Sequence, residues 1–261
     1  NLALDSGINF LDTAACYADT EELIGSTVSH RRDEFFLASK CGHAVDSSLE
    51  PWTAEVIAES VDRSLKRLRT DHLDVLQLHT PTLDVLQRGE VVEAAVKARD
   101  QGKTRFIGFS GDNEAAVTAC ESGVFDTLQT SFNLVDQSAR GRLFAAARAS
   151  DMGTIIKRPV GNGAWGRGES PYRYANEYFR RAQVMEEMGP LAGSPEDPIL
   201  LAMGFLFAHD EVDTAIVGTH NPTHLTANIE MVENDLPIPA EAVEELRRRF
   251  DEVGQDWPGL T

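Results

Sequence analysis

The stretch AEVIAESVDRSLKRLRTDHLDVLQLH, residues 54–79, contains both periodicities on which the prediction of the fold depends. In its first part, apolar residues recur at steps of four, four and three: Ile57, Val61, Leu65 and Leu68. This spacing places them on one face of an amphipathic helix over residues 54–68. The second part, LDVLQLH, is a short apolar run with the length of a buried strand. A helix followed by a strand is the unit from which parallel sheets are built.

The same alternation continues along the chain in both directions. Strands are expected at residues 8–12, 35–40, 73–79, 106–110, 127–132, 154–157 and 214–218. Helices are expected at residues 54–68, 91–99, 140–150 and 199–208, and a last amphipathic helix within residues 236–250. Regular alternation of this kind implies parallel strands that are joined by helical crossovers.

Two parallel architectures fit such a pattern, the open doubly wound sheet and the eight-stranded barrel. The open dinucleotide-binding sheet would carry G-x-G-x-x-G after its first strand, and no early strand is followed by it. Polar residues instead close the expected strands: Asp12, Lys40, His79, Ser110, Asn133, Lys157 and Thr219. In a barrel these strand ends meet at one mouth. We therefore predict an α/β fold, a (β/α)8 TIM barrel, as a single domain over residues 1–261. Seven strands are counted, and the first strand is expected to be missing because residues 2–6 read as the tail of a helix.

Composition excludes several classes of function. The 261 residues include 42% hydrophobic and 25% charged residues, the mixture of an ordinary globular protein. No apolar run approaches the roughly 20 residues of a membrane helix, so no membrane partner is expected. The net charge of −18 repels phosphate backbones, which argues against nucleic acid. Three cysteines, an odd number without metal-ligand spacing, favour a reduced, cytoplasmic setting and no metal.

Four polar residues at or just after successive strands are the candidates for chemistry: Asp12, Tyr17, Lys40 and His79. Taken singly, each has a common structural role, as a turn residue, a packing residue, a surface lysine or a buried core histidine. Their joint placement at one mouth is harder to attribute to structure alone. A phenol with a pKa of about 10 is a poor acid near neutrality, and a nearby ammonium lowers that pKa. We expect Asp12 to hold the ammonium of Lys40, and His79 to orient the oxygen of a carbonyl substrate that Tyr17 protonates.

At this point a family resemblance can be stated. GINFLDTAACYADTEELIG at residues 7–25, ASK at residues 38–40 and LDVLQLHTP at residues 73–81 together resemble the aldo-keto reductase superfamily. The resemblance extends to about Asn228. It implies a TIM barrel that uses a nicotinamide cofactor and reduces a small carbonyl substrate. It also implies that Asp12, Tyr17, Lys40 and His79 form the catalytic tetrad, with Tyr17 as the acid–base.

The resemblance also implies contacts to the nicotinamide. FIGFSG is similar to the family's IGxSN, so Ser110 is expected at the carboxamide, with Gly111 in place of the usual Asn. Gln129 in LQTSFN matches the family's carboxamide-contacting Gln. In IIKRPVGNG, Lys157 stands where the family has an aromatic residue that stacks on the ring. The following residues complete this part of the predicted cofactor site: Arg158 and Pro159.

Contacts to the adenosine phosphate are implied by AIVGTHNPTHLTANI, residues 215–229. Gly218 and Thr219 are expected to end a strand, and the helix opened by Asn221-Pro222 presents N–H groups that attract phosphate. The predicted contacts on that helix are made by His224, at the position of an Arg that grips the 2′-phosphate, and by Asn228 at the adenine. We expect NADPH as the cofactor, with NADH as the alternative. His220 and His224 have the spacing of a metal pair on a helix, but no third ligand is near.

Three functions are weighed on these observations. The first is NAD(P)H-dependent reduction of an aldehyde or ketone to an alcohol, with the reverse oxidation. The second is a non-catalytic, cofactor-binding regulatory or scaffold barrel of the same family. The third is a Schiff-base aldolase with Lys40 or Lys157 as the nucleophile. The glycine-rich residues 160–171 are interpreted either as a solvated loop or as a lid over the cofactor.

Overall fold

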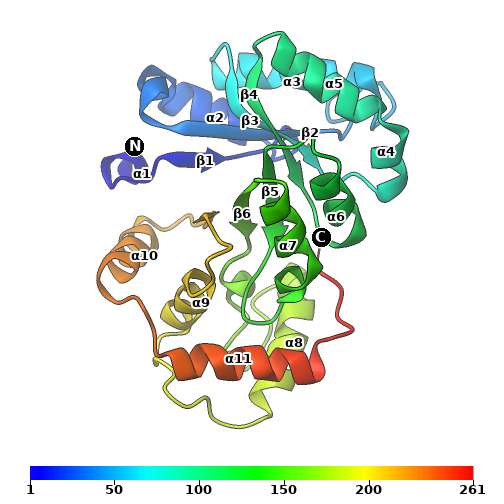
Figure 1. Ribbon diagram of the computed structural model, residues 1–261. Helices are drawn as coiled ribbons and strands as arrows, with labels where there is room; N and C mark the ends of the chain where they lie inside the picture. The colour runs from blue at the N-terminus through cyan, green and yellow to red at the C-terminus, as the bar shows by residue number, and fades with distance from the viewer. Residues whose placement is uncertain (261) are drawn as a thin grey trace. The chain divides into compact units, whose positions relative to one another are not determined.

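The computed structural model describes residues 1–260, which group into two compact units that we describe separately. The first unit contains residues 1–129 and 149–153. The second contains residues 130–148 and 154–260 of the described chain. Figure 1 follows the chain from its blue N-terminal end to its red C-terminal end.

Seven strands lie within residues 1–260, as predicted: β1 (Phe10–Asp12), β2 (Phe36–Cys41), β3 (Leu73–His79), β4 (Thr104–Ser110), β5 (Thr127–Ser131), β6 (Gly153–Lys157) and β7 (Thr214–Ala215). In the first unit β1, β2, β3, β4 and β5 pair in chain order, and every pairing is parallel. In the second unit β6 pairs parallel with β7. The register sets Lys40 beside Gln77 and His79 beside Ser110, so polar residues gather at the carboxyl ends of the strands.

The observed strands begin and end within one or two residues of the predicted ones, except for β7. It was expected over residues 214–218 but ends at Ala215. The N–H of Ile216 still donates to the carbonyl of Ile156 at 2.9 Å, and beyond it the chain turns into an exposed loop. Gly218 and Thr219 therefore follow the strand rather than end it, which corrects the prediction for these two positions.

Helices connect the strands throughout the described chain. Those of residues 1–129 are α1 (Leu2–Asp5), α2 (Thr20–Thr27), α3 (Ala54–Leu68), α4 (Leu83–Arg88), α5 (Glu90–Asp100) and α6 (Asn113–Glu121). The later helices are α7 (Arg142–Ala149), α8 (Asn176–Glu186), α9 (Pro198–Phe207), α10 (Pro222–Asn234) and α11 (Ala240–Val253). Short 3-10 helices lie between them: η1 (Ser29–Glu34), η2 (Ser138–Arg140), η3 (Gly161–Gly163) and η4 (Arg173–Ala175). Among the described residues, we find no helix with the length and apolar character needed to cross a membrane.

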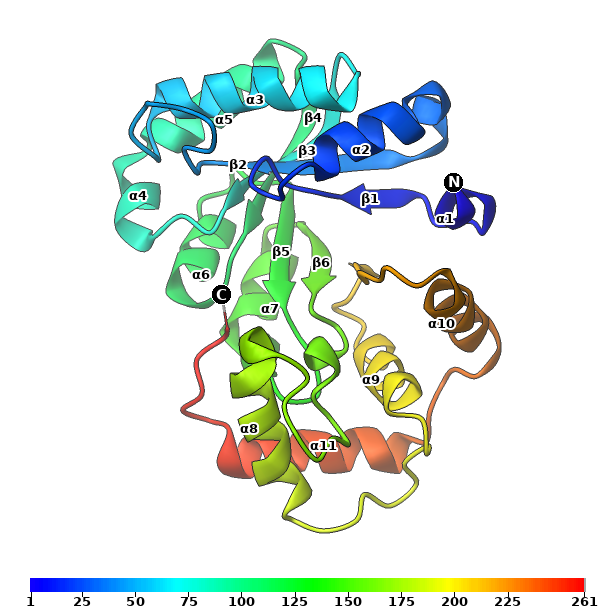
Figure 2. The same cartoon turned by 180° about the vertical axis from the view of Figure 1, so that it is seen from behind.

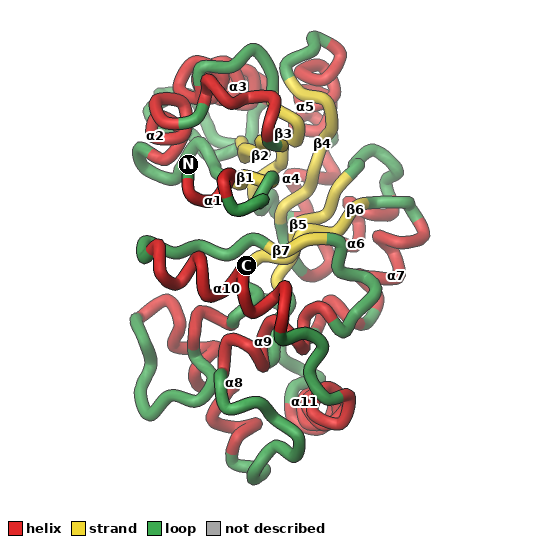
Figure 3. Tube along the Cα trace, turned by 90° about the vertical axis from the view of Figure 1, so that its left-hand side faces the viewer, coloured by secondary structure: helices red, strands yellow, loops and turns green. Residues whose placement is uncertain are grey.

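In the first unit α2, α3 and α5 lie side by side against the strands, as the opposite views in Figure 1 and Figure 2 show. The apolar stripe of α3 is buried, including Ile57, Val61 and Leu68, while its polar face is exposed. Gly25 allows α2 to approach α3 closely, because a Cβ at this position would come within 2.1 Å of the carbonyl oxygen of Arg67. Figure 3 shows the same helices in red beside the yellow strands. This packing fixes the strands whose ends carry the candidate residues.

In the second unit α11 packs against α8 and α9. Its predicted range of 236–250 shifts to Ala240–Val253, because the helix begins only after Pro239. Arg249 of α11 is fully buried and donates to the carbonyls of Met185 at 2.9 Å and Pro190 at 3.0 Å. A guanidinium that satisfies carbonyl groups at the end of α8 is a structural element of this unit.

Candidate active site

Asp12, the last residue of β1, lies at the centre of a buried polar cluster. Its Oδ2 pairs at 2.5 Å with the Nζ of Lys40, which stands near the end of β2 and is only 2% exposed. The same Nζ donates to the backbone carbonyl of Thr13 at 2.9 Å. A buried side-chain nitrogen with a carboxylate and a carbonyl as partners is held in one position. The predicted pairing of Asp12 with Lys40 is therefore present in the structure.

The second oxygen of Asp12 connects the remaining strands of the first unit. Its Oδ1 accepts hydrogen bonds from the Nε2 of Gln77 at 3.0 Å and from the Nε2 of Gln129 at 2.7 Å. The hydroxyl of Ser110 in turn donates to the Oε1 of Gln129 at 3.1 Å. Side chains from β1 to β5 thus meet in one network at the carboxyl ends of their strands. Ser110 and Gln129, which were predicted to contact the cofactor, belong to this network.

Gly108 gives the amide of Gln77 the space to reach across. A Cβ on Gly108 would lie 2.5 Å from the Oγ1 of Thr127 and 2.8 Å from the Cγ of Gln77. Contacts this short do not occur between real atoms, so a side chain on β4 would push Gln77 away from Asp12. The glycine therefore allows the strands on either side of it to share one buried carboxylate.

Tyr17 lies in the turn that follows β1, where its backbone N–H donates to the carbonyl of Ala14 at 3.0 Å. The ammonium of Lys40 lies 4.9 Å from the centre of the phenol ring. The ring of His79 meets it edge-on, with 5.6 Å between the ring centres. Tyr17 is 42% exposed, His79 is partly exposed and Lys40 is buried. All four predicted tetrad residues therefore lie together in the first unit, and the phenol among them is partly exposed.

His79, the last residue of β3, has further neighbours that the sequence did not indicate. The Sγ of Cys16 lies 3.4 Å from its Nδ1. The ring of His43 lies edge-on at 5.1 Å, and Trp52 continues the row at 5.2 Å from His43. Burial lowers the pKa of His43, and a hydrogen bond to the backbone of His79 offsets part of this decrease. His43 is therefore a neutral ring near neutral pH, and one wall of the site is aromatic.

Gln77, Cys16 and His43 are the residues that sequence reasoning missed. Gln77 carried a usable signal, because it is a polar residue in an apolar strand and stands two positions before His79, on the same face of the strand. Cys16 stands directly before Tyr17 and His43 three positions after Lys40. Neither of them is marked by a local pattern.

Lys157, Arg158 and Pro159 lie in the second unit at the end of β6. Lys157 is largely buried, and Arg158 adopts a left-handed backbone with φ of 56°. The guanidinium of Arg158 donates to the hydroxyls of Ser131, at 3.2 Å, and Tyr174 and to the carbonyl of Leu260. Arg158 is thus already bound to groups of its own unit.

The predicted phosphate segment is also part of the second unit. The side chain of Asn221 accepts the N–H of Thr223 at 3.0 Å and caps α10, which begins at Pro222 as predicted. Of the two residues predicted to contact the cofactor from this helix, His224 is exposed and Asn228 is partly exposed. His220 precedes α10 and does not share its face with His224, so the suggested histidine pair does not lie on one helix.

Residues 160–171 include the short helix η3, and Gly166 is tied to α8 by the hydrogen bond of its N–H to the Oε1 of Glu186 at 2.7 Å.

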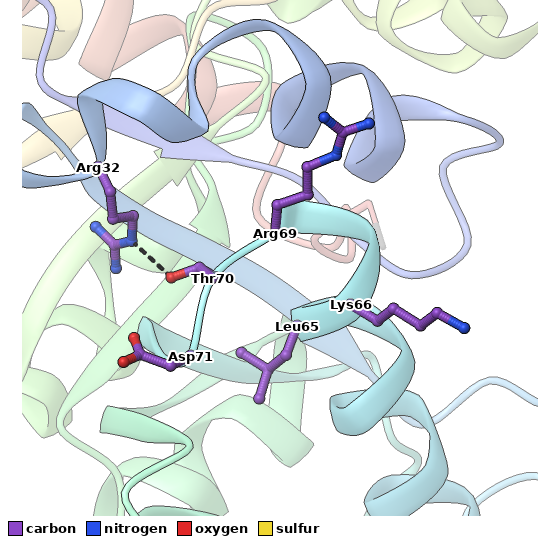
Figure 4. A pocket seen from close by; sticks show the side chains of 6 residues that line it. All are labelled: Arg32, Leu65, Lys66, Arg69, Thr70 and Asp71. Carbon is purple, nitrogen blue, oxygen red and sulfur yellow. Dashed lines mark hydrogen bonds between the residues drawn. The ribbon is translucent and has the colours of Figure 1, made fainter.

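A shallow surface hollow lies at the opposite, amino ends of β2 and β3, and Figure 4 shows the side chains around it. It is lined by Arg32, Leu65, Lys66, Arg69, Thr70 and Asp71. The Nε of Arg32 donates to the hydroxyl of Thr70 at 3.2 Å, shown as a dashed line. No predicted site residue lines this hollow, so the network around Asp12 remains the candidate active site.

Comparison with solved structures identifies the fold of this chain. An aldo-keto reductase from Bacillus halodurans in its holo form superposes with a TM-score of 0.78 and 26% sequence identity. The match covers 95% of this chain and 84% of the other. The (β/α)8 class predicted from the sequence is therefore confirmed.

Comparison with curated proteins identifies oxidoreductases. An uncharacterized oxidoreductase of Bacillus subtilis is 27% identical over 87% of this chain and 79% of its own length. The L-galactose dehydrogenase of Arabidopsis thaliana is 24% identical over 97% of this chain and 83% of its own length. The sequence model of the Aldo/keto reductase family matches residues 1–249. The chain belongs to the aldo-keto reductase family of oxidoreductases, whose members typically use nicotinamide cofactors.

Proposed function

We propose that this protein reduces aldehydes or ketones to alcohols with NADPH as the preferred cofactor and NADH as the alternative, and that Tyr17 is the proton donor. The observation that carries the proposal is the position of Lys40. Its ammonium is buried, fixed by Asp12 at 2.5 Å and placed 4.9 Å from the ring centre of a half-exposed phenol. A fixed positive charge beside a phenol favours loss of the phenolic proton, which is what a general acid needs.

In this proposal each side chain of the site has its own role. Asp12 keeps the ammonium in place, and Gln77 and Gln129 keep Asp12 in place. The imidazole of His79 donates to the carbonyl oxygen of the substrate and orients it beside the hydroxyl of Tyr17. The phenolic proton then moves to that oxygen. The nicotinamide, when bound, supplies the hydride that goes to the carbonyl carbon.

The donors in the structure suit a nicotinamide nucleotide. The amide of Gln129 uses its Oε1 for Ser110 and its Nε2 for Asp12, and each of these atoms has the capacity for a second hydrogen bond. The exposed loop before α10 leads into a helix N-terminus, a setting that attracts phosphate. Because Arg158 is bound within its own unit, we expect discrimination of the 2′-phosphate to depend mainly on the segment that contains His224.

The aldolase alternative is less well supported for Lys40. A Schiff-base nucleophile needs a nitrogen that is free to attack a carbonyl carbon, whereas the Nζ of Lys40 is already bound to a carboxylate at 2.5 Å and to a backbone carbonyl at 2.9 Å. Borohydride in the presence of a carbonyl compound would label a lysine only under the aldolase mechanism.

The test is a titration of the purified chain with NADPH and with NADH, followed by nicotinamide fluorescence and then by a panel of aldehydes and ketones. Binding of NADPH together with its oxidation by a carbonyl compound supports the proposal. Binding without turnover of any substrate would indicate the non-catalytic cofactor-binding function. Failure to bind either nucleotide would contradict the proposal.

A further inference from the structure

We propose that Cys16 is a positioning residue for His79. In this proposal the thiol donates a hydrogen bond to Nδ1 and keeps the single proton of the neutral ring on Nε2. The inference rests on the proposed function, because the Nε2–H is the group that would meet the oxygen of the carbonyl substrate.

Geometry is the first argument. The Sγ of Cys16 lies 3.4 Å from the Nδ1 of His79, although the two residues are 63 positions apart in the chain. Cys16 is held by the turn that also places Tyr17, since Ala15 donates its N–H to the carbonyl of Lys40 at 3.1 Å and Tyr17 donates to Ala14 at 3.0 Å. One turn therefore aims the phenol and the thiol at the same imidazole.

The direction of the hydrogen bond follows from the two groups. A neutral imidazole has one nitrogen that accepts and one that donates, while thiol sulfur is a weak acceptor. The thiol retains its proton at neutral pH, because burial raises the pKa of Cys16. A backbone hydrogen bond and the charge of Lys40 offset part of this rise, and Glu21 adds to it. A protonated thiol is a donor and a poor nucleophile, which favours a positioning role over a redox or nucleophilic one.

The surroundings of the ring agree with a neutral, oriented imidazole. Burial lowers the pKa of His43, so the neighbouring ring brings no positive charge near neutral pH. The hydroxyl of Thr80 donates to the backbone carbonyl of His79 at 2.6 Å and helps to fix the main chain at the end of β3. With the proton on Nε2, the substrate oxygen would receive one hydrogen bond from His79 and the transferred proton from Tyr17. His79 itself would keep its proton throughout.

The experiment is 15N NMR of histidine-labelled protein at neutral pH, where the protonated and unprotonated nitrogens of a ring give separate signals. His79→Gln assigns the His79 signals. Cys16→Ser retains an O–H donor, and Cys16→Val removes the donor while filling a similar volume. Cys120→Ala is the matched control, since Cys120 is a fully buried thiol in α6. The kcat/KM for a carbonyl substrate is measured on the same samples.

We expect the wild type and Cys16→Ser to show the proton on Nε2, and Cys16→Val to shift His79 toward a mixture of tautomers. The kcat/KM should fall roughly fivefold to tenfold in Cys16→Val, the size of one lost neutral hydrogen bond, and Cys16→Ser should restore most of it. Cys120→Ala should change neither readout.

An unchanged His79 spectrum in Cys16→Val would overturn the inference whatever the activity, as would a wild-type spectrum with the proton on Nδ1. A changed spectrum in a protein that turns over no carbonyl compound would sustain the hydrogen bond while the proposed function failed. If Cys16→Val did not fold, comparison of the wild type with Cys16→Ser would still decide the tautomer. Loss of the Nε2–H signal of His79 in a folded Cys16→Ser would also contradict the inference. A hydroxyl donor at this position should keep the proton on Nε2.

Discussion

The two ends of the strands in the first unit each hold a buried carboxylate that is paired with a cation. At the carboxyl end, Asp12 pairs with Lys40 at 2.5 Å. At the amino end, Asp74 near the start of β3 accepts from Arg32 at 2.6 Å and from Arg105 at 3.1 Å. The two carboxylates are shielded to a similar degree, with 6% and 4% of their side chains exposed. Burial and charge pairing alone therefore do not distinguish a site from a structural contact.

The difference lies in the other partners of each cation. Arg32 also donates to the backbone carbonyls of Phe35 at 2.8 Å and His72 at 3.3 Å, so its planar fork ties together the segments that lead into two strands. Lys40 donates to a single backbone carbonyl, that of Thr13, and its compact charge lies beside the half-exposed ring of Tyr17. The pair of Arg32 with Asp74 therefore stabilises the chain, whereas the pair of Lys40 with Asp12 places a charge next to a partly exposed phenol. The predictions below test this division.

The largest effect is expected for Tyr17→Phe, which removes only the hydroxyl. Because a general acid contributes about 10²–10⁴-fold, kcat should fall by that order while the affinity for NADPH stays nearly unchanged. Steady-state kinetics give kcat, and a fluorescence titration gives the affinity for NADPH. Tyr172→Phe, a change in another exposed phenol, is the control. Turnover near the wild-type rate in Tyr17→Phe would remove Tyr17 from its proposed role.

Lys40→Met should affect both chemistry and stability. It leaves the buried Asp12 without its cation, which lowers the free energy of unfolding by about 3–5 kcal/mol, and residual activity should have a shifted pH profile. Lys103→Met is the matched control, because Lys103 pairs with Asp62 at the same 2.5 Å on the surface. This substitution should lower the free energy of unfolding by at most about 1 kcal/mol. Urea unfolding and pH–rate profiles are the measurements. An unchanged pH profile would mean that Lys40 does not tune the acid.

The sequence predicted those features that depend on local pattern. The range of α3 agrees to the residue, because an apolar stripe of period 3.6 is preceded by Thr53, whose hydroxyl accepts the N–H of Val56 at 3.3 Å as an N-cap. Parallel pairing in chain order brings the carboxyl ends of the strands together. For this reason the positions of Asp12 and Lys40 could be predicted from strand ends alone.

Features that depend on partners far apart in the chain could not be predicted in the same way. Gln77 reaches Asp12 because the register aligns their strands and Gly108 leaves space, and neither condition is local. The contact of Cys16 with His79 likewise depends on the shape of a turn. Pairing of Arg158 with groups near residue 260 depends on the path of the C-terminal segment.

Asp74→Asn should affect stability and leave the chemistry intact. Asparagine can still accept the N–H of Leu37 but loses the charge that holds Arg32, so the free energy of unfolding should fall by about 1.5–3 kcal/mol. The kcat of the folded enzyme should match the wild type. Asp71→Asn, a change at an exposed carboxylate in the preceding turn, is the control for urea unfolding. A large loss of kcat in folded Asp74→Asn would show that the two ends of the strands are coupled.

The smallest effect concerns acid stability and separates the two carboxylates further. Burial raises the pKa of Asp74, but the hydrogen bonds from Leu37 and Arg32 outweigh it, and the folded pKa lies below the usual value. An aspartate in the unfolded chain has a pKa of about 3.9, so its stabilisation is complete above that pH and is lost as the pH falls through the folded value. The free energy of unfolding of the wild type, measured in urea, should therefore fall more steeply below about pH 4 than that of Asp74→Asn. Parallel curves for the two proteins would contradict the role of Asp74 as a structural anion, because a carboxylate that stabilises the fold must lose that contribution when it takes up a proton.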